Sequence, residues 1–484
     1  MAGAVSRTVA DEVSEKVALE GAWGGDPAEA WSAYEPTAEA PWNRERVAHL
    51  YRRVAYGASW SELEAGLVRS PQELVRELVE GRGDVERFER EMESLTASVR
   101  SGDSIEAAQG LWIYRMLHSP HPLRETLTLI WHNRFATSAT KVRSVALMQR
   151  QNELLRAQAL GKFDELLWLM TIDAAMLVWL DATSNRKGHP NENYARELME
   201  LFSLGVGQYS ERDIQEAARA LTGWTVKEGR SEFRLAEFDA GVKTIFGQTG
   251  AWQARDVVRL CAAQPACAWS VVRNLVAEFV GPDFVVGAAG ERLLAPLVQA
   301  FRDSELDVKA CVARILGSRL FFSEAARWTI VKSPVALVVG LVKSLEGRVG
   351  PEKLVKACDG LGQSLLKPPS VKGWDGGAEW INSTTLLRRQ NLAFEATRGT
   401  GDVVRLDPAR LADKYDLDGH DAIATFFLQL FLQRDDPEVH ETLVAEMNRV
   451  ARDPGLVLAG KLRRAAVMRT AAHLAMTLPE FQLR

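Results

Sequence analysis

Residues 145–181, VALMQRQNELLRAQALGKFDELLWLMTIDAAMLVWLD, decide the fold class. Apolar side chains recur there every three or four residues, which is the spacing of one face of an α-helix. The pattern is interrupted near Gly161 and Thr171, so the stretch predicts two or three consecutive helices. Similar patterns occur on both sides of it along most of the chain. We therefore predict a mostly α protein with a multi-helical globular body.

Local signals mark where individual helices begin and end. In SPQELVRELVEG, residues 70–81, Ser70 is a predicted N-cap and Pro71 takes the first helical position. Glu73 completes a capping box with Ser70, and Gly81 ends the helix. In SERDIQEAARALTGW, Ser210 and Asp213 predict a second capping box. Helices with such defined ends support the assignment of a helical body.

One region departs from the helical pattern, between Trp224 and Gly250. There SEFRL alternates sides through Phe233 and Leu235, and glycines bound AGVKTIFGQTG. Short alternating runs bounded by glycine are typical of strands joined by turns. We expect a small β-hairpin insertion at 224–250, projecting from the helical body.

The composition is that of an ordinary globular protein, with 46% hydrophobic and 25% charged residues among 484. The formal net charge of −5 argues against a nucleic-acid partner, because a phosphate-binding surface usually carries a basic excess. No window reaches the roughly 18 apolar residues of a membrane span, and no signal-peptide pattern is present. We expect a cytoplasmic protein without a membrane span, although a missing or replaced leader would permit export. The four cysteines lack metal-ligand spacing and are predicted to be buried thiols: Cys261, Cys267, Cys311 and Cys358.

The chain divides into three expected parts. Residues 1–40 are acidic and mostly aperiodic, which predicts a flexible N-terminal arm whose aromatic side chains contact the body. Residues 41–400 form the expected helical core domain and carry every motif described below. Residues 401–484 return to amphipathic helices, which we expect to pack on that core as a C-terminal helical segment.

The densest group of polar side chains lies in HPNENYARELMELFSLGVGQYSERD, residues 189–213. Asn193, Glu197 and Glu200 share one helical face, while Glu192, Arg196 and Glu200 form a second line at i+4 spacing. A solvated ladder of ion pairs explains such a pattern without any function. Crowded carboxylates also shift one another's pKa, so that one serves as a general acid beside an ionised base or nucleophile. The same oxygens could instead hold a hard divalent cation.

Two further groups are candidates for a site. His132, in WHNRFATS, is the histidine expected to transfer a proton or to hydrogen-bond a ligand; a buried structural histidine is the alternative. Trp374 and Trp380 lie on a Gly/Pro/Trp-rich loop, KPPSVKGWDGGAEWINSTT, at 367–385. Such tryptophans form a stacking platform for a sugar or another flat ligand, or else a lid packed on the core. No histidine pair has the H-x-x-x-H spacing, so no zinc site is predicted.

Five segments resemble, in order, the bacterial domain of unknown function 1800 family. They are HLYRRVAYGAS (49–59), WHNRFATS (131–138), PNENYARELMELFSLGVGQYSERDIQEAARALTGW (190–224), VKSPVALVVG (331–340) and LGQSLLKPPSVKGWDGGAEWINSTTLLRR (361–389). The resemblance implies no established reaction. It does imply a partner, since the family is often encoded beside a second one, domain of unknown function 1501, that looks like the sulfatase and alkaline-phosphatase superfamily.

The resemblance also marks the family's motif residues in this chain: Asn191, Glu192, Asn193, Arg196, Glu197, Glu200, Asp213, Arg219, Trp224, Lys332, Trp374, Trp380 and Asn382. The chain departs from the family pattern at Arg134 and Phe238, where many members carry histidine. If either histidine serves catalysis in the family, the activity of this protein is altered.

We expect an enzyme, a carbohydrate-active hydrolase acting on glycosidic bonds, with Glu192 and Glu197 as the acid/base pair. His132 and Asp213 are the other catalytic candidates. The expected substrate-binding residues are Asn191, Asn193, Arg196, Glu200, Trp224, Lys332, Trp374, Trp380 and Asn382. One alternative is a non-catalytic helical scaffold that binds the sulfatase-like partner or an envelope polymer. The other is an all-α enzyme dependent on Mg²⁺ or Ca²⁺, with these ligands: Glu192, Glu197, Glu200 and Asp181.

Overall fold

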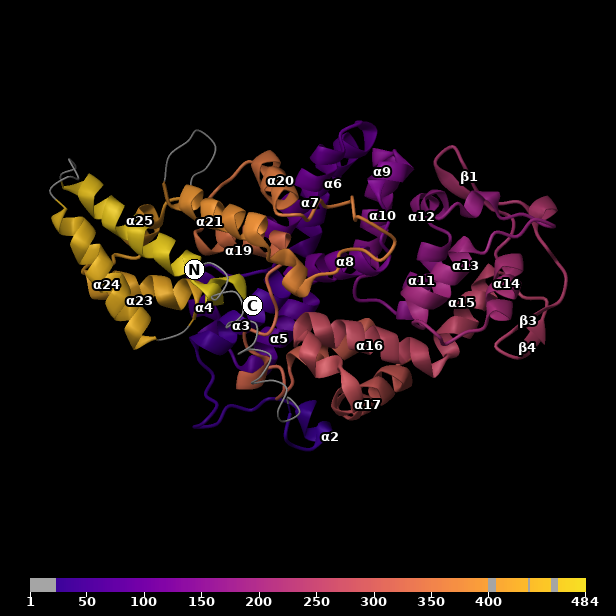
Figure 1. Ribbon diagram of the computed structural model, residues 1–484, viewed down its shortest axis with the longest axis horizontal. Helices are drawn as coiled ribbons and strands as arrows, with labels where there is room; N and C mark the ends of the chain where they lie inside the picture. The colour runs from indigo at the N-terminus through magenta and orange to yellow at the C-terminus, as the bar shows by residue number, and fades with distance from the viewer. Residues whose placement is uncertain (1–22, 399–405, 434–435, 454–459) are drawn as a thin grey trace. The chain divides into compact units, whose positions relative to one another are not determined.

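A computed structural model describes residues 23–398, 406–433, 436–453 and 460–484 (Figure 1). Helices make up most of these ranges, and the strands within them form two antiparallel two-stranded sheets. The prediction of a mostly α fold with a small hairpin insertion is therefore confirmed. Residues 1–22 of the predicted N-terminal arm lie outside the described ranges. None of the helices in those ranges combines the length and the apolar character that crossing a bilayer requires.

The chain divides into two compact units, each assembled from two separate stretches of sequence. Of the described residues, unit 1 takes 23–36 and 153–330. Unit 2 takes 37–152 and the described residues from 331 onwards. The predicted core domain and C-terminal segment thus do not coincide with either unit, because both units join stretches that lie far apart in the sequence.

Unit 1 is a helical body that carries both sheets. Its helices are α2 (Pro27–Ala30), α11 (Phe163–Thr171), α12 (Ala174–Trp179), α13 (Asn193–Glu197), α14 (Glu211–Ala220), α15 (Ala254–Ala263), α16 (Pro265–Phe279), α17 (Gly287–Asp303) and α18 (Val308–Leu316). The π-helical turn η2 (Leu198–Ser203) follows directly on α13. Near the N-terminus, Trp31 is buried and its Nε1 donates to Leu293 O at 2.7 Å, which anchors α2 to α17.

The two sheets of unit 1 are tight hairpins. Strand β1 (Trp224–Lys227) pairs with β2 (Arg230–Phe233), and β3 (Lys243–Ile245) pairs with β4 (Gln248–Gly250). Each loop has two residues with positive φ, Glu228-Gly229 in the first hairpin and Phe246-Gly247 in the second. Two consecutive residues with positive φ are typical of the type I′ turn, whose twist matches that of antiparallel strands. The glycine of each pair supplies this conformation without steric cost.

Unit 2 consists of helices with long connecting loops. They are α3 (Arg44–Ala55), α4 (Trp60–Leu67), α5 (Pro71–Glu80), α6 (Val85–Ser101), α7 (Ile105–His118), α8 (Pro122–Arg134), α9 (Ala139–Val142), α19 (Pro334–Ser344), α20 (Pro351–Gly360), α21 (Ser383–Arg398), α22 (Pro408–Lys414), α23 (His420–Phe431), α24 (Pro437–Arg452) and α25 (Lys461–Thr477). Helix α10 (Val145–Ala157) contains the division between the units. Every residue of α19 from Pro334 to Val342 is buried, so this apolar helix forms the centre of unit 2.

The predicted helix ends are confirmed where local signals were strong. Ser70 and Glu73 form the capping box of α5, with Pro71 in its first turn, and Gly81 follows its last residue. Ser210 and Asp213 form the capping box of α14. All four cysteines are free and buried, as predicted.

Candidate functional site

The predicted carboxylate cluster lies on α13 and η2 in unit 1. One face of these turns is core: Tyr194, Leu198 and Phe202 are buried, and the Tyr194 hydroxyl donates to Thr171 Oγ1 at 3.0 Å. The chain then changes from α- to π-helical pairing, with Leu204 N donating to Met199 O at 2.8 Å. Single π-helical turns of this kind are frequent at functional sites. The other face carries the half-exposed glutamates.

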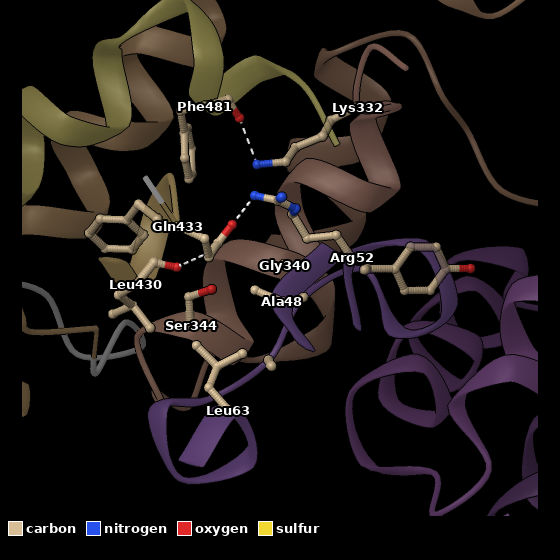
Figure 2. A pocket seen from close by; sticks show the side chains of 13 residues that line it. Ala48, Arg52, Leu63, Lys332, Gly340, Ser344, Leu430, Gln433 and Phe481 are labelled. Atoms are coloured by element: carbon tan, nitrogen blue, oxygen red, sulfur yellow. Dashed lines mark hydrogen bonds between the residues drawn. The ribbon is translucent and has the colours of Figure 1, made fainter. Parts of the chain in front are cut away.

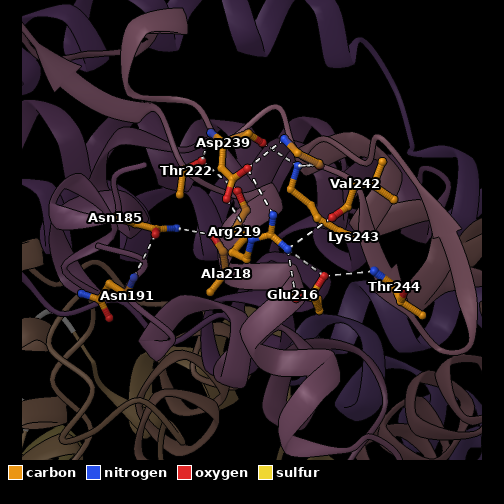
Figure 3. A network of polar contacts seen from close by, with 11 residues as sticks. Asn185, Asn191, Glu216, Ala218, Arg219, Thr222, Asp239, Val242, Lys243 and Thr244 are labelled. Carbon is orange, nitrogen blue, oxygen red and sulfur yellow. Dashed lines mark hydrogen bonds and ion pairs between the residues drawn. The ribbon is translucent and has the colours of Figure 1, made fainter. Parts of the chain in front are cut away.

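The two asparagines of this motif are committed to the fold of the preceding loop. Asn191 Nδ2 donates to Ser184 Oγ at 2.8 Å, and Asn193 Nδ2 donates to Leu180 O at 3.0 Å. The amide N of Asn191 donates to Asn185 Oδ1 at 2.9 Å, and Asn185 Nδ2 donates to Ala218 O at 2.8 Å (Figure 3). Buried Asn185 therefore ties the motif to α14. It was missed in the sequence because an asparagine in a polar loop carries no distinguishing signal.

Several charged side chains of the motif already have partners within unit 1. Arg196 makes two 2.8 Å hydrogen bonds to the carboxylate of Glu211, which raise the pKa of the arginine. Glu200 accepts a 2.5 Å hydrogen bond from the Tyr209 hydroxyl. Glu192 and Glu197 are five residues apart, so on a regular helix they leave the axis roughly 140° from one another. That separation does not favour the expected acid/base pair.

One face of α14 holds the backbone of the second hairpin. Asp213 Oδ1 accepts from Phe246 N at 2.7 Å, and Glu216 Oε2 accepts from Thr244 N at 3.0 Å (Figure 3 shows the second contact). Burial alone would raise the pKa of Asp213, but hydrogen bonds from Ser210 and Phe246 outweigh it and lower that pKa. Asp213 thus caps helix α14 and also holds the β3–β4 turn against that helix through its hydrogen bond from Phe246 N.

The same helix ends in a partly buried ion network (Figure 3). Arg219 Nε donates to Asp239 Oδ2 at 2.8 Å, and its Nη1 donates to both oxygens of Glu216 at 3.0 Å. Buried Lys243 donates to Asp239 O at 2.5 Å, and burial lowers its pKa. Phe238, one of the two departures from the family pattern, lies with its ring 4.9 Å from Lys243 Nζ. Arginine and lysine here serve the fold of the hairpin.

In unit 2, His132 lies buried between two tryptophans. Its ring centroid is 5.4 Å from that of Trp112 on α7 and 5.8 Å from that of Trp374. Burial lowers the pKa of His132 to about 4, so the ring is neutral near pH 7. Its Nε2 atom is buried and forms no hydrogen bond with the described residues.

The aromatic loop is fixed above this histidine. Asn133 Oδ1 accepts from Trp374 N at 2.7 Å, and Asn133 Nδ2 donates to Trp374 O at 3.3 Å. Trp374 and Trp380 are 7% and 8% exposed, which is the burial of a packed lid and not of an open stacking platform. Asn382 is exposed, and its Oδ1 accepts from Thr385 N at 2.9 Å in the first turn of α21. Trp224, in unit 1, begins β1 and contacts Trp168 and Phe233.

Lys332 lines a pocket of unit 2 that contains a second cation (Figure 2). Its Nζ donates to Phe481 O at 2.6 Å, while the Arg52 guanidinium, also in the lining, donates to Gln433 Oε1. Arg389 Nη2 donates to Lys332 O at 2.8 Å from outside the lining. Sequence reasoning named only Lys332. Arg52 and Arg389 lie in segments that carry the family resemblance, and this could have indicated that they belong to a site. No feature of the sequence marks Gln433 in this way.

No three His, Cys, Asp or Glu side chains in the described part of the chain are grouped so as to hold a metal ion. The ligands considered for Mg²⁺ or Ca²⁺ therefore do not form a preassembled cage there: Glu192, Glu197, Glu200 and Asp181.

The chain belongs to a family described as protein of unknown function (DUF1800), whose model matches residues 49–483. This match confirms the resemblance that the five segments carry. Comparison with curated proteins and with solved structures returns no match.

Proposed function

We propose that this protein is a non-catalytic helical scaffold, and that the hairpin region of unit 1 binds a protein partner. One observation carries the proposal: several polar side chains of the long motif form hydrogen bonds inside unit 1. Asp213 and Glu216 hold the backbone of the second hairpin, while Asn191 and Asn193 hold the loop before α13. A group that performs acid/base chemistry must reach a substrate proton, and these groups are already engaged.

The hairpin region carries exposed apolar side chains. Phe233, Leu235 and Val242 lie between the end of β2 and the start of β3, and Leu235 is 74% exposed. Phe233 is linked to Phe238 by a ring contact of 5.5 Å, and Phe238 in turn contacts buried Lys243. Apolar side chains gathered on a firmly held surface support a role in protein recognition. The partner we propose is the sulfatase-like protein that the family resemblance implies.

The test is binding between the purified full chain and that sulfatase-like protein, measured by calorimetry. Leu235→Glu should weaken binding by about tenfold or more, because a charge replaces an apolar contact. Val286→Glu is the matched control, since Val286 is 62% exposed in the same unit but lies before α17. We expect it to bind like the wild type. Absence of wild-type binding, or equal weakening by both substitutions, would contradict the proposal.

A second candidate keeps the expected hydrolase acting on glycosidic bonds. It is favoured by Glu192, a half-exposed carboxylate that forms no hydrogen bond with the described residues and lies one short helix before the π-helical turn. If Glu192 and Glu197 are the acid and base, each Glu→Gln substitution should lower turnover by about 100-fold or more. Glu211→Gln, which removes only a surface ion pair, should have little effect. Turnover of nitrophenyl glycosides and of cell-envelope polysaccharides provides the assay, and no turnover by the wild type would exclude this candidate.

A further inference from the structure

The pocket of unit 2 contains two buried cations beside polar and apolar side chains (Figure 2). It is lined by residues of α3, α19, α23 and the segments around Lys332 and Phe481, and it is partly open to solvent. Arg52 and Lys332 are 4% and 6% exposed. Ser344 and Gln433 add a hydroxyl and a carboxamide to the lining. The pocket therefore offers several hydrogen-bond donors, two of them on buried cationic side chains.

Lys332 has no carboxylate partner among the described residues. Its ammonium donates to Phe481 O and lies 4.0 Å from the centre of the Phe481 ring. Burial holds the pKa of Lys332 well below its usual range, and the positive charges of Arg52, Arg389 and Arg484 lower it further. A buried charge is costly unless an opposite charge neutralises it. The protein itself supplies no such charge to Lys332 within the described chain.

Arg389 extends the same positive region. It is 2% exposed, and burial lowers its pKa to about 10. Its guanidinium donates to Gln482 Oε1 at 3.1 Å and to Lys332 O at 2.8 Å, both uncharged oxygens. An oxyanion supplies the negative charge that Lys332 lacks, and lysine and arginine are the side chains that bind phosphate and sulfate groups.

We propose that this pocket binds a phosphate or sulfate group, with Lys332 and Arg52 as its charged contacts. Three of the five segments that carry the family resemblance meet at this site. Residues 49–59 supply Arg52, residues 331–340 supply Lys332, and residues 361–389 supply Arg389. The site is separate from the hairpins of unit 1, so it holds whether or not the scaffold proposal is correct.

The experiment is calorimetric titration of the full chain with sodium phosphate and with sodium sulfate, using sodium chloride of equal ionic strength as the reference. We expect saturable binding of at least one of the two oxyanions and none of chloride. Lys332→Met should weaken binding by about tenfold or more, because a charge-assisted hydrogen bond is lost. Lys343→Met is the matched control. Lys343 is a half-buried lysine of unit 2 whose pKa burial also lowers, but Glu62 acts on it as a counter-charge.

Two additions keep the result interpretable. Ser344→Leu fills the pocket without changing any charge, so it should abolish binding even if Lys332→Met does not fold. Glycerol phosphate and methyl sulfate are titrated separately. Their binding would show that the site accepts a phosphate or sulfate group attached to a larger molecule, and not only the free ion. If neither Lys332→Met nor Ser344→Leu changes the binding of the oxyanion, the proposal is overturned. Equal heats for chloride and the oxyanions would overturn it too.

Discussion

Gly373 is the residue at which the aromatic loop comes closest to helix α8. Its φ is +80°, and a Cβ atom there would lie far inside van der Waals contact with Asn133 Oδ1 and Asn133 O. Gly373→Ala should therefore cost about 2–5 kcal/mol, from backbone strain together with overpacking. It should also break the two hydrogen bonds between Asn133 and Trp374. Urea unfolding followed by tryptophan fluorescence measures the loss.

Gly377→Ala separates these two causes. Gly377 lies in the same loop with φ +56°, and nothing lies within 4 Å of the position of its Cβ. We expect only the strain cost there, about 1–2 kcal/mol. Equal destabilisation by the two substitutions would show that the close approach to Asn133 contributes nothing.

His132 should make stability depend on pH. Burial lowers its pKa from 6.5 to about 4, so between these values the unfolded chain binds a proton that the folded chain does not. Stability contributed by the neutral ring is complete above pH 6.5 and is lost as the pH falls towards 4, by about 3 kcal/mol in all. His132→Phe cannot titrate, so its unfolding free energy should fall less over this window. His189→Gln, a change at an exposed histidine, should retain the wild-type profile.

The sequence allowed us to predict which residues belong to the candidate sites. It did not allow us to predict which other residues they contact. His132 and Trp374 are 242 positions apart in the numbering, yet their ring centroids are 5.8 Å apart. Lys332 was named without Arg52 and Arg389, because the pocket joins segments that are distant in the chain. Helical spacing places side chains on a face, but it does not determine which loop returns to cover that face.

At the scale of elements, prediction worked where the signal is local. The capping boxes of α5 and α14 depend on residues three positions apart, and both are present. The hairpins depend on glycines in the turns and on alternation over a few residues. The π-helical turn after Glu197 was not predicted, because its pattern of apolar residues does not differ from that of an α-helix over so short a stretch.

Asp213 links two elements, since it caps α14 and accepts the amide hydrogen of Phe246 in the β3–β4 turn. Asp213→Ala should cost about 2 kcal/mol, from the lost cap and from an amide left without its acceptor. Hydrogen exchange at Phe246 should become faster. Glu211→Ala changes a residue of the same first turn that makes only an exposed ion pair, and should cost much less than Asp213→Ala. If hydrogen exchange at Phe246 is unchanged in Asp213→Ala, Asp213 does not hold the β3–β4 turn in place.

At the scale of the whole molecule, the division into two units could not be predicted from the sequence. Composition changes little where the chain leaves one unit for the other, near residues 36, 152 and 330. Long-range contacts create the division, such as the hydrogen bond from Trp31 to Leu293 and the ring contact of 4.7 Å between Tyr34 and Phe322. Contacts across such separations leave no periodic trace in either segment.

The division predicts that each unit can be loosened separately. Trp31 is buried in unit 1 and Trp112 in unit 2, so replacing either with alanine should cost about 3–5 kcal/mol locally. In Trp31→Ala, hydrogen exchange should rise in peptides from 153–330 and stay near wild type in those from 37–152. Trp112→Ala should give the reverse, because sub-global opening follows cooperative units. A uniform rise across both sets of peptides, in either variant, would mean that the two units open as one.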